Sequence, residues 1–212
     1  MSATQSNCQL YLISPLDVSG NFPTRLERAL DAGDGLVTAF QFRMKDIDQH
    51  EAARLAEPLQ PICAEREVAF IVNDSVSLAK RLKADGVHLG QKDGNPRDAR
   101  EELGREAQIG VTCHDSKHLA MEAGEAGAGY VAFGAFFPSS TKQTEYHPDP
   151  EVLEWWSALF EIPCVAIGGI TPGNCGALAK AGADFLAVSG AVWNGDEAAG
   201  VRAFADAIKE AG

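Results

Sequence analysis

An alternation of two patterns most constrains the fold of this chain: eight short apolar segments are each followed by a segment with helical periodicity. Strands that alternate with helices pair in parallel, because each helix returns the chain to the same edge of the sheet. Eight such units in 212 residues predict a single (β/α)₈ TIM barrel domain over residues 1–212, with an open doubly wound sheet as the alternative. The expected strands are 9–14, 37–44, 69–74, 86–90, 108–113, 130–136, 163–169 and 185–190, and the expected helices are 22–33, 48–67, 75–84, 95–104, 115–127, 149–161, 171–182 and 197–212.

The charge balance limits the partners of the chain. It has 18 basic against 30 acidic residues, a net charge of −12. Nucleic acids and anionic membranes bind basic surfaces, so both are disfavoured as partners. A small anionic ligand in a local basic pocket remains compatible with this balance.

The N-terminal segment and the cysteines indicate the compartment. Residues 1–10 lack the basic and apolar regions of a signal peptide, and no apolar run approaches the ~20 residues that span a bilayer. Five cysteines, with no C-x-x-C pair, predict neither a disulfide framework nor a cysteine zinc site. We expect a soluble cytoplasmic protein without a membrane partner.

Polar and apolar side chains alternate in "FQFRMKD", residues 40–46. Successive strand residues point to opposite faces, so Gln41, Arg43 and Lys45 share one face. Charged residues cannot fill the packed interior of a barrel, so an inward row of this kind belongs at its C-terminal mouth, where active sites of such barrels lie. The row predicts an anion-binding wall.

Carboxylates follow the next two strands. Asn73 and Asp74 end one strand, and Asp93 comes shortly after the following strand. Neighbouring strands lie about 4.8 Å apart, so both carboxylates could reach one ion. Mg²⁺ is typically bound by one or two carboxylates together with substrate phosphate oxygens. The alternative is that Asp74 caps the following helix and Asp93 caps a turn; the nearby cationic row favours the metal.

Two later segments predict a second anion pocket. "PSSTK", residues 138–142, offers hydroxyls and a lysine, a weak signal by itself. Gly168 and Gly169 allow close backbone approach, and a helix beginning at Thr171 would offer unpaired N–H groups. Ser189 and Gly190 end the last strand, and loops after the seventh and eighth strands commonly bind phosphate in these barrels. Tight-turn packing is the alternative.

Other candidate residues have weaker patterns. Cys113, His114 and His118 could supply zinc ligands, but a fourth ligand and an H-E-x-x-H pattern are missing. Cys113 as a nucleophile lacks an identified base. His88 is expected to be a hydrogen-bonded interior residue of the barrel rather than a base. Trp155 and Trp156 are expected to be one core residue and one interface residue, which leaves a homo-oligomer open.

Several motifs together resemble the thiamine phosphate synthase (thiamine-phosphate pyrophosphorylase) family. "QFRMK", "ND", "GVHLGQKD", "GVTCH", "FPSSTK" and "VAIGGIT" occur in the family's order, over about residues 9–191. The resemblance implies a (β/α)₈ transferase that needs Mg²⁺ and joins two small molecules. These are hydroxymethylpyrimidine diphosphate and hydroxyethylthiazole phosphate, or its carboxylated form. The products would be thiamine phosphate and diphosphate, with carbon dioxide from the carboxylated form.

The resemblance also implies roles for individual residues. Diphosphate would leave the pyrimidine methylene in a dissociative step, the thiazole nitrogen would capture the cation, and no protein nucleophile would be needed. Arg43, Lys45 and Lys142 would stabilise the departing diphosphate. The pyrimidine substrate would be held by Gln41, Arg43, Lys45, Asn73, Thr112 and Lys142; Mg²⁺ by Asp74 and Asp93; and the thiazole phosphate by Ser139, Ser140, Thr141, Gly169, Ser189 and Gly190.

Three positions depart from the family pattern. Ser139 stands where the family often has threonine, Thr112 where it often has serine, and Ser189-Gly190 where a hydrophobic–serine pair is usual. The first two keep a hydroxyl, whereas the third offers backbone N–H groups to the phosphate and moves the serine hydroxyl one place earlier, to Ser189. Three other functions stay open: a thiazole tautomerase, a non-catalytic ligand-binding regulator, and another phosphate-binding barrel enzyme such as a sugar-phosphate epimerase. The retained cations and paired aspartates fit each of these less well.

Overall fold

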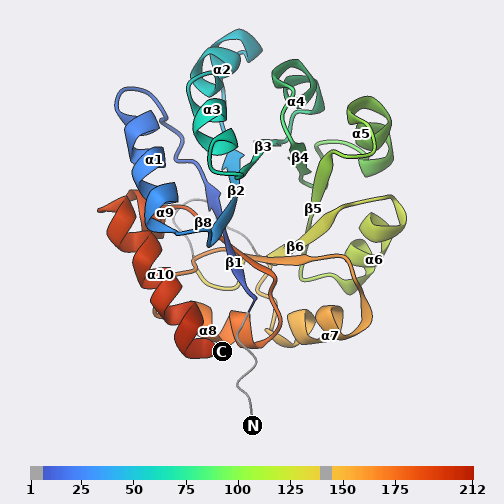
Figure 1. Ribbon diagram of the computed structural model, residues 1–212. Helices are drawn as coiled ribbons and strands as arrows, with labels where there is room; N and C mark the ends of the chain where they lie inside the picture. The colour runs from blue at the N-terminus through green and yellow to red at the C-terminus, as the bar shows by residue number, and fades with distance from the viewer. Residues whose placement is uncertain (1–6, 139–144) are drawn as a thin grey trace.

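A computed structural model describes residues 7–138 and 145–212. Its eight strands form a closed parallel barrel in chain order, surrounded by helices (Figure 1). The barrel prediction is therefore confirmed, and the open sheet is wrong, because β1 pairs with both β2 and β8. The strands are β1 (Gln9–Ile13), β2 (Val37–Phe42), β3 (Ala69–Asn73), β4 (Gly86–Leu89), β5 (Gln108–His114), β6 (Tyr130–Gly134), β7 (Cys164–Ile167) and β8 (Phe185–Val188).

The helices follow the predicted order with three differences. The expected helix 48–67 divides at Pro58, which lacks an N–H donor, into α2 and α3. A short helix, α9, was not predicted. The seventh predicted helix begins at Cys175 rather than Thr171. The helices are α1 (Phe22–Ala32), α2 (Gln49–Ala56), α3 (Leu59–Ala64), α4 (Val76–Leu82), α5 (Pro96–Leu103), α6 (Lys117–Glu125), α7 (Glu151–Leu159), α8 (Cys175–Lys180), α9 (Gly190–Trp193) and α10 (Glu197–Ala211).

Two apolar layers lie on opposite sides of the strands. Outward-facing side chains such as Phe40, Phe42 and Phe70 pack between the barrel and its helices. Inward-facing side chains, including Tyr11, Ile71, Tyr130 and Val165, form a smaller cluster inside the barrel. The alternation of the strands thus buries both faces.

The predicted second strand is too long. β2 ends at Phe42, so Gln41 belongs to the strand but Arg43 and Lys45 follow it. Gln41 is 3% exposed and points inward, whereas Arg43 is half-buried and Lys45 is exposed. A charged side chain near the open end can reach water, which the interior does not offer.

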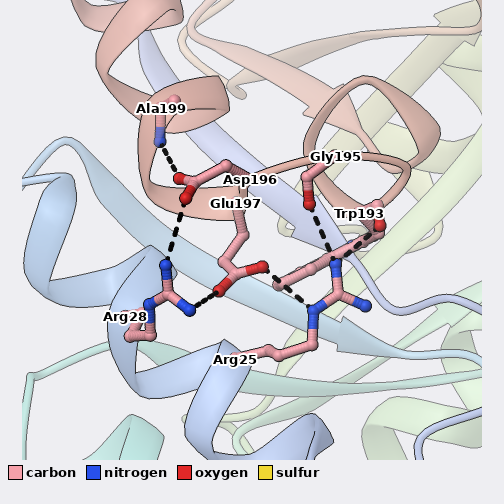
Figure 2. A network of polar contacts seen from close by, with 7 residues as sticks. All are labelled: Arg25, Arg28, Trp193, Gly195, Asp196, Glu197 and Ala199. Carbon is pink, nitrogen blue, oxygen red and sulfur yellow. Dashed lines mark hydrogen bonds and ion pairs between the residues drawn. The ribbon is translucent and has the colours of Figure 1, made fainter.

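An ion-pair network joins the first and last helices where the barrel closes (Figure 2). The buried Glu197 carboxylate pairs with Arg25, at 3.0 Å between Nε and Oε2, and with Arg28, at 3.2 Å between Nη1 and Oε1. Arg25 also donates from Nη2 to the carbonyl of Trp193 (2.6 Å), and the indole of Trp193 donates to the Ile13 carbonyl (2.7 Å). The network fixes α9, directly after β8, against α1.

None of the described helices is long and apolar enough to cross a membrane. All five cysteines are free and buried.

Candidate active site

One cavity of about 800 Å³ opens at the carboxyl ends of the strands. Its lining includes every site residue predicted from the sequence that the structure describes. These are Gln41, Arg43, Lys45, Asn73, Asp74, Asp93, Thr112, Gly169, Ser189 and Gly190. Ser139, Ser140, Thr141 and Lys142 lie outside the described residues.

The cationic side of the cavity is anchored to β1. The backbone N–H of Arg43 donates to Oγ of Ser14 at 2.9 Å, and the Ser14 N–H donates to the Gln41 carbonyl at 2.9 Å. Ser14 is buried, so these bonds hold the chain directly after β2. Burial lowers the pKa of Arg43, and the charge of Asp74 opposes this. Arginine stays protonated in proteins regardless.

The two aspartates lie beside one another and have different local roles. Burial, followed by the neighbouring Asp93 carboxyl, raises the pKa of Asp74, while Lys45 and Arg43 act against the increase. Asp93 Oδ2 accepts from the Gly90 N–H at 3.0 Å, so the predicted turn cap exists. The predicted helix cap at Asp74 is wrong, because Ser75 caps α4 by accepting from the Leu78 N–H. The Asp74 side chain is therefore available to the cavity.

Close backbone packing shapes the glycine side. Gly168 and Gly169 have φ of 101° and 63°, and a Cβ on Gly169 would lie 2.6 Å from the Phe137 carbonyl oxygen. Only glycine fits such a position. The predicted helix start at Thr171 is wrong, since its N–H donates to Oδ1 of Asn174 at 2.8 Å. The turn packs tightly against the Phe137 segment, and it also lines the cavity.

The third departure from the family pattern lies at the start of α9. Ser189 and Gly190 line the cavity where β8 passes into α9. A Cβ on Gly190 would lie 3.0 Å from Nδ2 of Asn194, so the backbone here packs closely. The first N–H groups of a helix lack intrahelical partners and point along its axis.

Polar groups fill the floor of the cavity. His88 is 6% exposed and bonds through Nδ1 to the Tyr130 hydroxyl (3.0 Å) and through Nε2 to Oγ1 of Thr112 (2.8 Å). The Tyr130 hydroxyl contacts the Tyr11 hydroxyl at 2.8 Å, and Gln41 donates to Tyr11 at 3.0 Å. The prediction that His88 is a hydrogen-bonded interior residue is confirmed. Burial raises the pKa of both tyrosines above the ordinary value, so their hydroxyls stay protonated.

Several residues in and beneath the cavity were not predicted from the sequence. Ser14, Tyr11 and Tyr130 carry polar groups on otherwise apolar strands, and that polarity was the signal available. Gln91 donates to the Thr112 carbonyl, and Tyr146 stacks on His114 with ring centroids 4.1 Å apart. The last contact joins segments 32 residues apart, which no local pattern indicates.

The weaker candidates do not form a site. Across residues 7–138 and 145–212, no three acidic, histidine or cysteine side chains are grouped as metal ligands. Burial raises the pKa of the Cys113 thiol to about 12, which makes it a poor nucleophile. His118 is an exposed residue beside Glu122. Trp156 is a core residue, and Lys117 lies over the ring of the half-buried Trp155.

Comparison with known proteins assigns the chain to a family. A family model described as thiamine monophosphate synthase matches residues 10–192. The chain belongs to this family. A thiamine-phosphate synthase from Erythrobacter litoralis is 74% identical over 213 aligned residues, with 100% of both chains covered. Another, from Rhodospirillum centenum, is 54% identical, with 89% of this chain and 91% of the relative covered.

A solved structure extends the similarity to the fold. Thiamine phosphate pyrophosphorylase from Pyrococcus furiosus superposes with a TM-score of 0.84 at 29% identity, covering 98% of each chain. The family resemblance inferred from the motifs is therefore confirmed. This places the chain among the transferases of thiamine biosynthesis.

Proposed function

We propose that this chain joins hydroxymethylpyrimidine diphosphate to hydroxyethylthiazole phosphate, or to its carboxylated form, within the one cavity. The observation that carries the proposal is the arrangement of that cavity: a cationic and carboxylate side faces a glycine-rich side. Two anions of different size would then be held in separate pockets of a common space, in position to react.

The cationic side suits the larger anion. Arg43 and Lys45 follow β2 and Asn73 ends β3, so three polar side chains meet one part of the cavity. Arginine and lysine bind phosphate oxygens by charge and by hydrogen bonds. We assign the pyrimidine diphosphate to this side, with Lys142 as a further cation proposed from the sequence alone.

The glycine side suits the smaller anion. Gly169 and Gly190 are half-buried glycines that line the cavity, and Ser189 adds a hydroxyl. Backbone N–H groups without a bulky neighbour bind phosphate well. We assign the thiazole phosphate here, with Ser139, Ser140 and Thr141 as further contacts proposed from the sequence alone.

The aspartate pair fits Mg²⁺. Two carboxylates held close together repel each other. Burial is the larger cause of the raised pKa of Asp74, and the charge of Asp93 is the second cause. A divalent cation bound between the carboxylates would relieve this repulsion. Two carboxylates with substrate oxygens match the usual donor set of this ion. When bound, Mg²⁺ would neutralise negative charge on the diphosphate.

Side chains of this chain would act on a leaving group rather than as nucleophiles. The bond between the pyrimidine methylene carbon and the diphosphate oxygen breaks, and its electron pair leaves with diphosphate. The lone pair of the thiazole nitrogen then forms the new carbon–nitrogen bond. Arg43, Lys45 and Lys142 stabilise the charge that develops on the diphosphate. Losing one such contact commonly costs about 3 kcal/mol, roughly a hundredfold in rate.

The rival functions need fewer of these groups. A thiazole tautomerase would use the glycine side but has no need for a diphosphate pocket. A ligand-binding regulator would not require both metal carboxylates and leaving-group cations. Because the cavity has Arg43, Lys45, Asp74 and Asp93 together, the coupling reaction fits it better.

The experiment incubates the purified chain with both substrates and Mg²⁺, with and without EDTA, and quantifies thiamine phosphate. We expect product that disappears with EDTA and returns with excess Mg²⁺. No product from a folded sample with either thiazole form would overturn the proposal.

A further inference from the structure

A continuous chain of hydrogen bonds crosses the barrel beneath the cavity. It runs from Gln41 to Tyr11 (3.0 Å), to Tyr130 (2.8 Å), to Nδ1 of His88 (3.0 Å), and from Nε2 of His88 to Thr112 (2.8 Å). The first four residues are each less than 9% exposed, and Gln41, His88 and Thr112 line the cavity. The chain thus joins two groups that line the same ligand space.

The amide at one end favours one direction for the whole chain. With Gln41 donating from Nε2 to the Tyr11 hydroxyl, every buried hydroxyl proton has an acceptor when Tyr11 donates to Tyr130 and Tyr130 donates to Nδ1 of His88. A neutral imidazole has one N–H, which is then on Nε2 and donates to Thr112. The hydroxyl proton of Thr112 is left for a ligand, while the amide oxygen of Gln41 is an acceptor. Reversing the bonds would turn the amide over and make Thr112 donate to His88, so that Thr112 could only accept from a ligand.

We infer that His88, Tyr130 and Tyr11 are positioning residues that set which recognition groups Gln41 and Thr112 present to the pyrimidine. The inference rests on the proposed function. An aminopyrimidine edge offers an amino donor next to a ring-nitrogen acceptor. An amide oxygen and a hydroxyl proton are the complementary pair, and a chain with fixed direction keeps both in that state.

The surrounding residues support a specific role over simple packing. Gly110 lacks a side chain where a Cβ would overlap the Tyr130 ring, so β5 makes room for this phenol. The rings of Tyr11 and Tyr130 pack edge to face, with their centroids 5.9 Å apart. Two phenylalanine rings would pack equally well in this arrangement. Burying hydroxyls costs free energy unless they are bonded, and only the hydroxyls transmit the direction.

The test measures binding preference, which is independent of the chemical step. The probes are the aminopyrimidine monophosphate and the same compound with hydrogen in place of the amino group, titrated by calorimetry. The variants are Tyr130→Phe and Tyr11→Phe. The control is Thr38→Val, which removes a hydrogen bond from Thr38, the second residue of β2, to Gln9, the first residue of β1. Thermal unfolding compares the stability of all samples.

We expect the wild type and Thr38→Val to share one preference for the amino compound, and each Tyr→Phe variant to reduce it about fivefold, the equivalent of one neutral hydrogen bond. Thr112→Ser, which keeps the hydroxyl, should retain the preference. An unchanged preference in both Tyr→Phe variants would overturn the inference, and so would an equal loss in Thr38→Val. Thiamine phosphate formation by the wild type is measured separately, so failure of the proposed function is distinguishable.

Discussion

Oγ of Ser14, the residue after β1, accepts the backbone N–H of Arg43, just beyond β2, at 2.9 Å. The contact fixes where the cationic loop leaves the barrel. We predict that Ser14→Ala lowers the free energy of unfolding by about 1 kcal/mol, because the half-buried N–H of Arg43 loses its acceptor. Displacement of Arg43 should also lower kcat/KM for the pyrimidine diphosphate about tenfold. Steady-state kinetics and urea unfolding measure both effects.

Ser19→Ala is the matched control for this prediction. Its hydroxyl bonds Asp17 on the surface at 2.6 Å, away from the cavity. Equal behaviour of the two alanine variants would contradict the role given to Ser14.

Asp93→Ala should abolish Mg²⁺-dependent turnover while the fold persists. One metal ligand is removed, which we expect to cost about a hundredfold or more in rate. The Gly90 N–H also loses its acceptor, a cost of about 1 kcal/mol to stability. Asp98→Ala, in the first turn of α5, is the control. Full activity of the Asp93 variant with native circular dichroism would remove the proposed metal site.

The raised pKa of Asp74 predicts that the stability of the metal-free protein depends on pH. Its folded pKa is raised, so the unfolded state loses this proton first and stability falls as pH increases from the ordinary carboxyl range through the raised folded value. An asparagine at this position would tolerate the φ of 65° and carry no charge. We predict that the difference in free energy of unfolding, Asp74→Asn minus wild type, increases from about pH 3 to about pH 7. A difference that is constant or decreasing with pH contradicts this.

The ion pair between Arg25 and Glu197 is expected to contribute strongly to the free energy of unfolding. Glu197 has a 4% exposed side chain, so Arg25→Ala would leave a buried carboxylate without one of its two partners (Figure 2). We expect a loss of about 3 kcal/mol, measured by urea unfolding. The control Arg54→Ala removes an exposed pair with Glu51 and should cost less than about 0.5 kcal/mol. Similar losses in the two variants would show that the Arg25 network contributes little.

The order of strands and helices could be predicted because strands and helices have different hydrophobic periodicities. The residues at which individual strands and helices begin and end were predicted less accurately. Arg43 continues the alternation of β2 in sequence, yet the strand ends at Phe42, because pairing with β3 stops there. Thr171 and Pro172 form a good helix start locally, but Asn174 binds the Thr171 N–H and the helix begins later.

The candidate site was predictable where chemistry gathers at strand ends, as at Asp74 and Asp93. Residues of the site whose hydrogen-bond partners lie far away in the sequence could not be predicted. Tyr11 and Tyr130 are 119 positions apart and look like ordinary strand tyrosines until the barrel brings their hydroxyls together. Such contacts depend on the closure of the sheet, which local patterns do not contain.

The stoichiometry of the coupling reaction tests the central claim most directly. Purified chain with Mg²⁺ and both substrates would be sampled over time for thiamine phosphate and diphosphate. We predict that the two products form one for one until the limiting substrate is consumed. Diphosphate release without thiamine phosphate, or no product from folded protein, would contradict the claim that this cavity joins the two substrates.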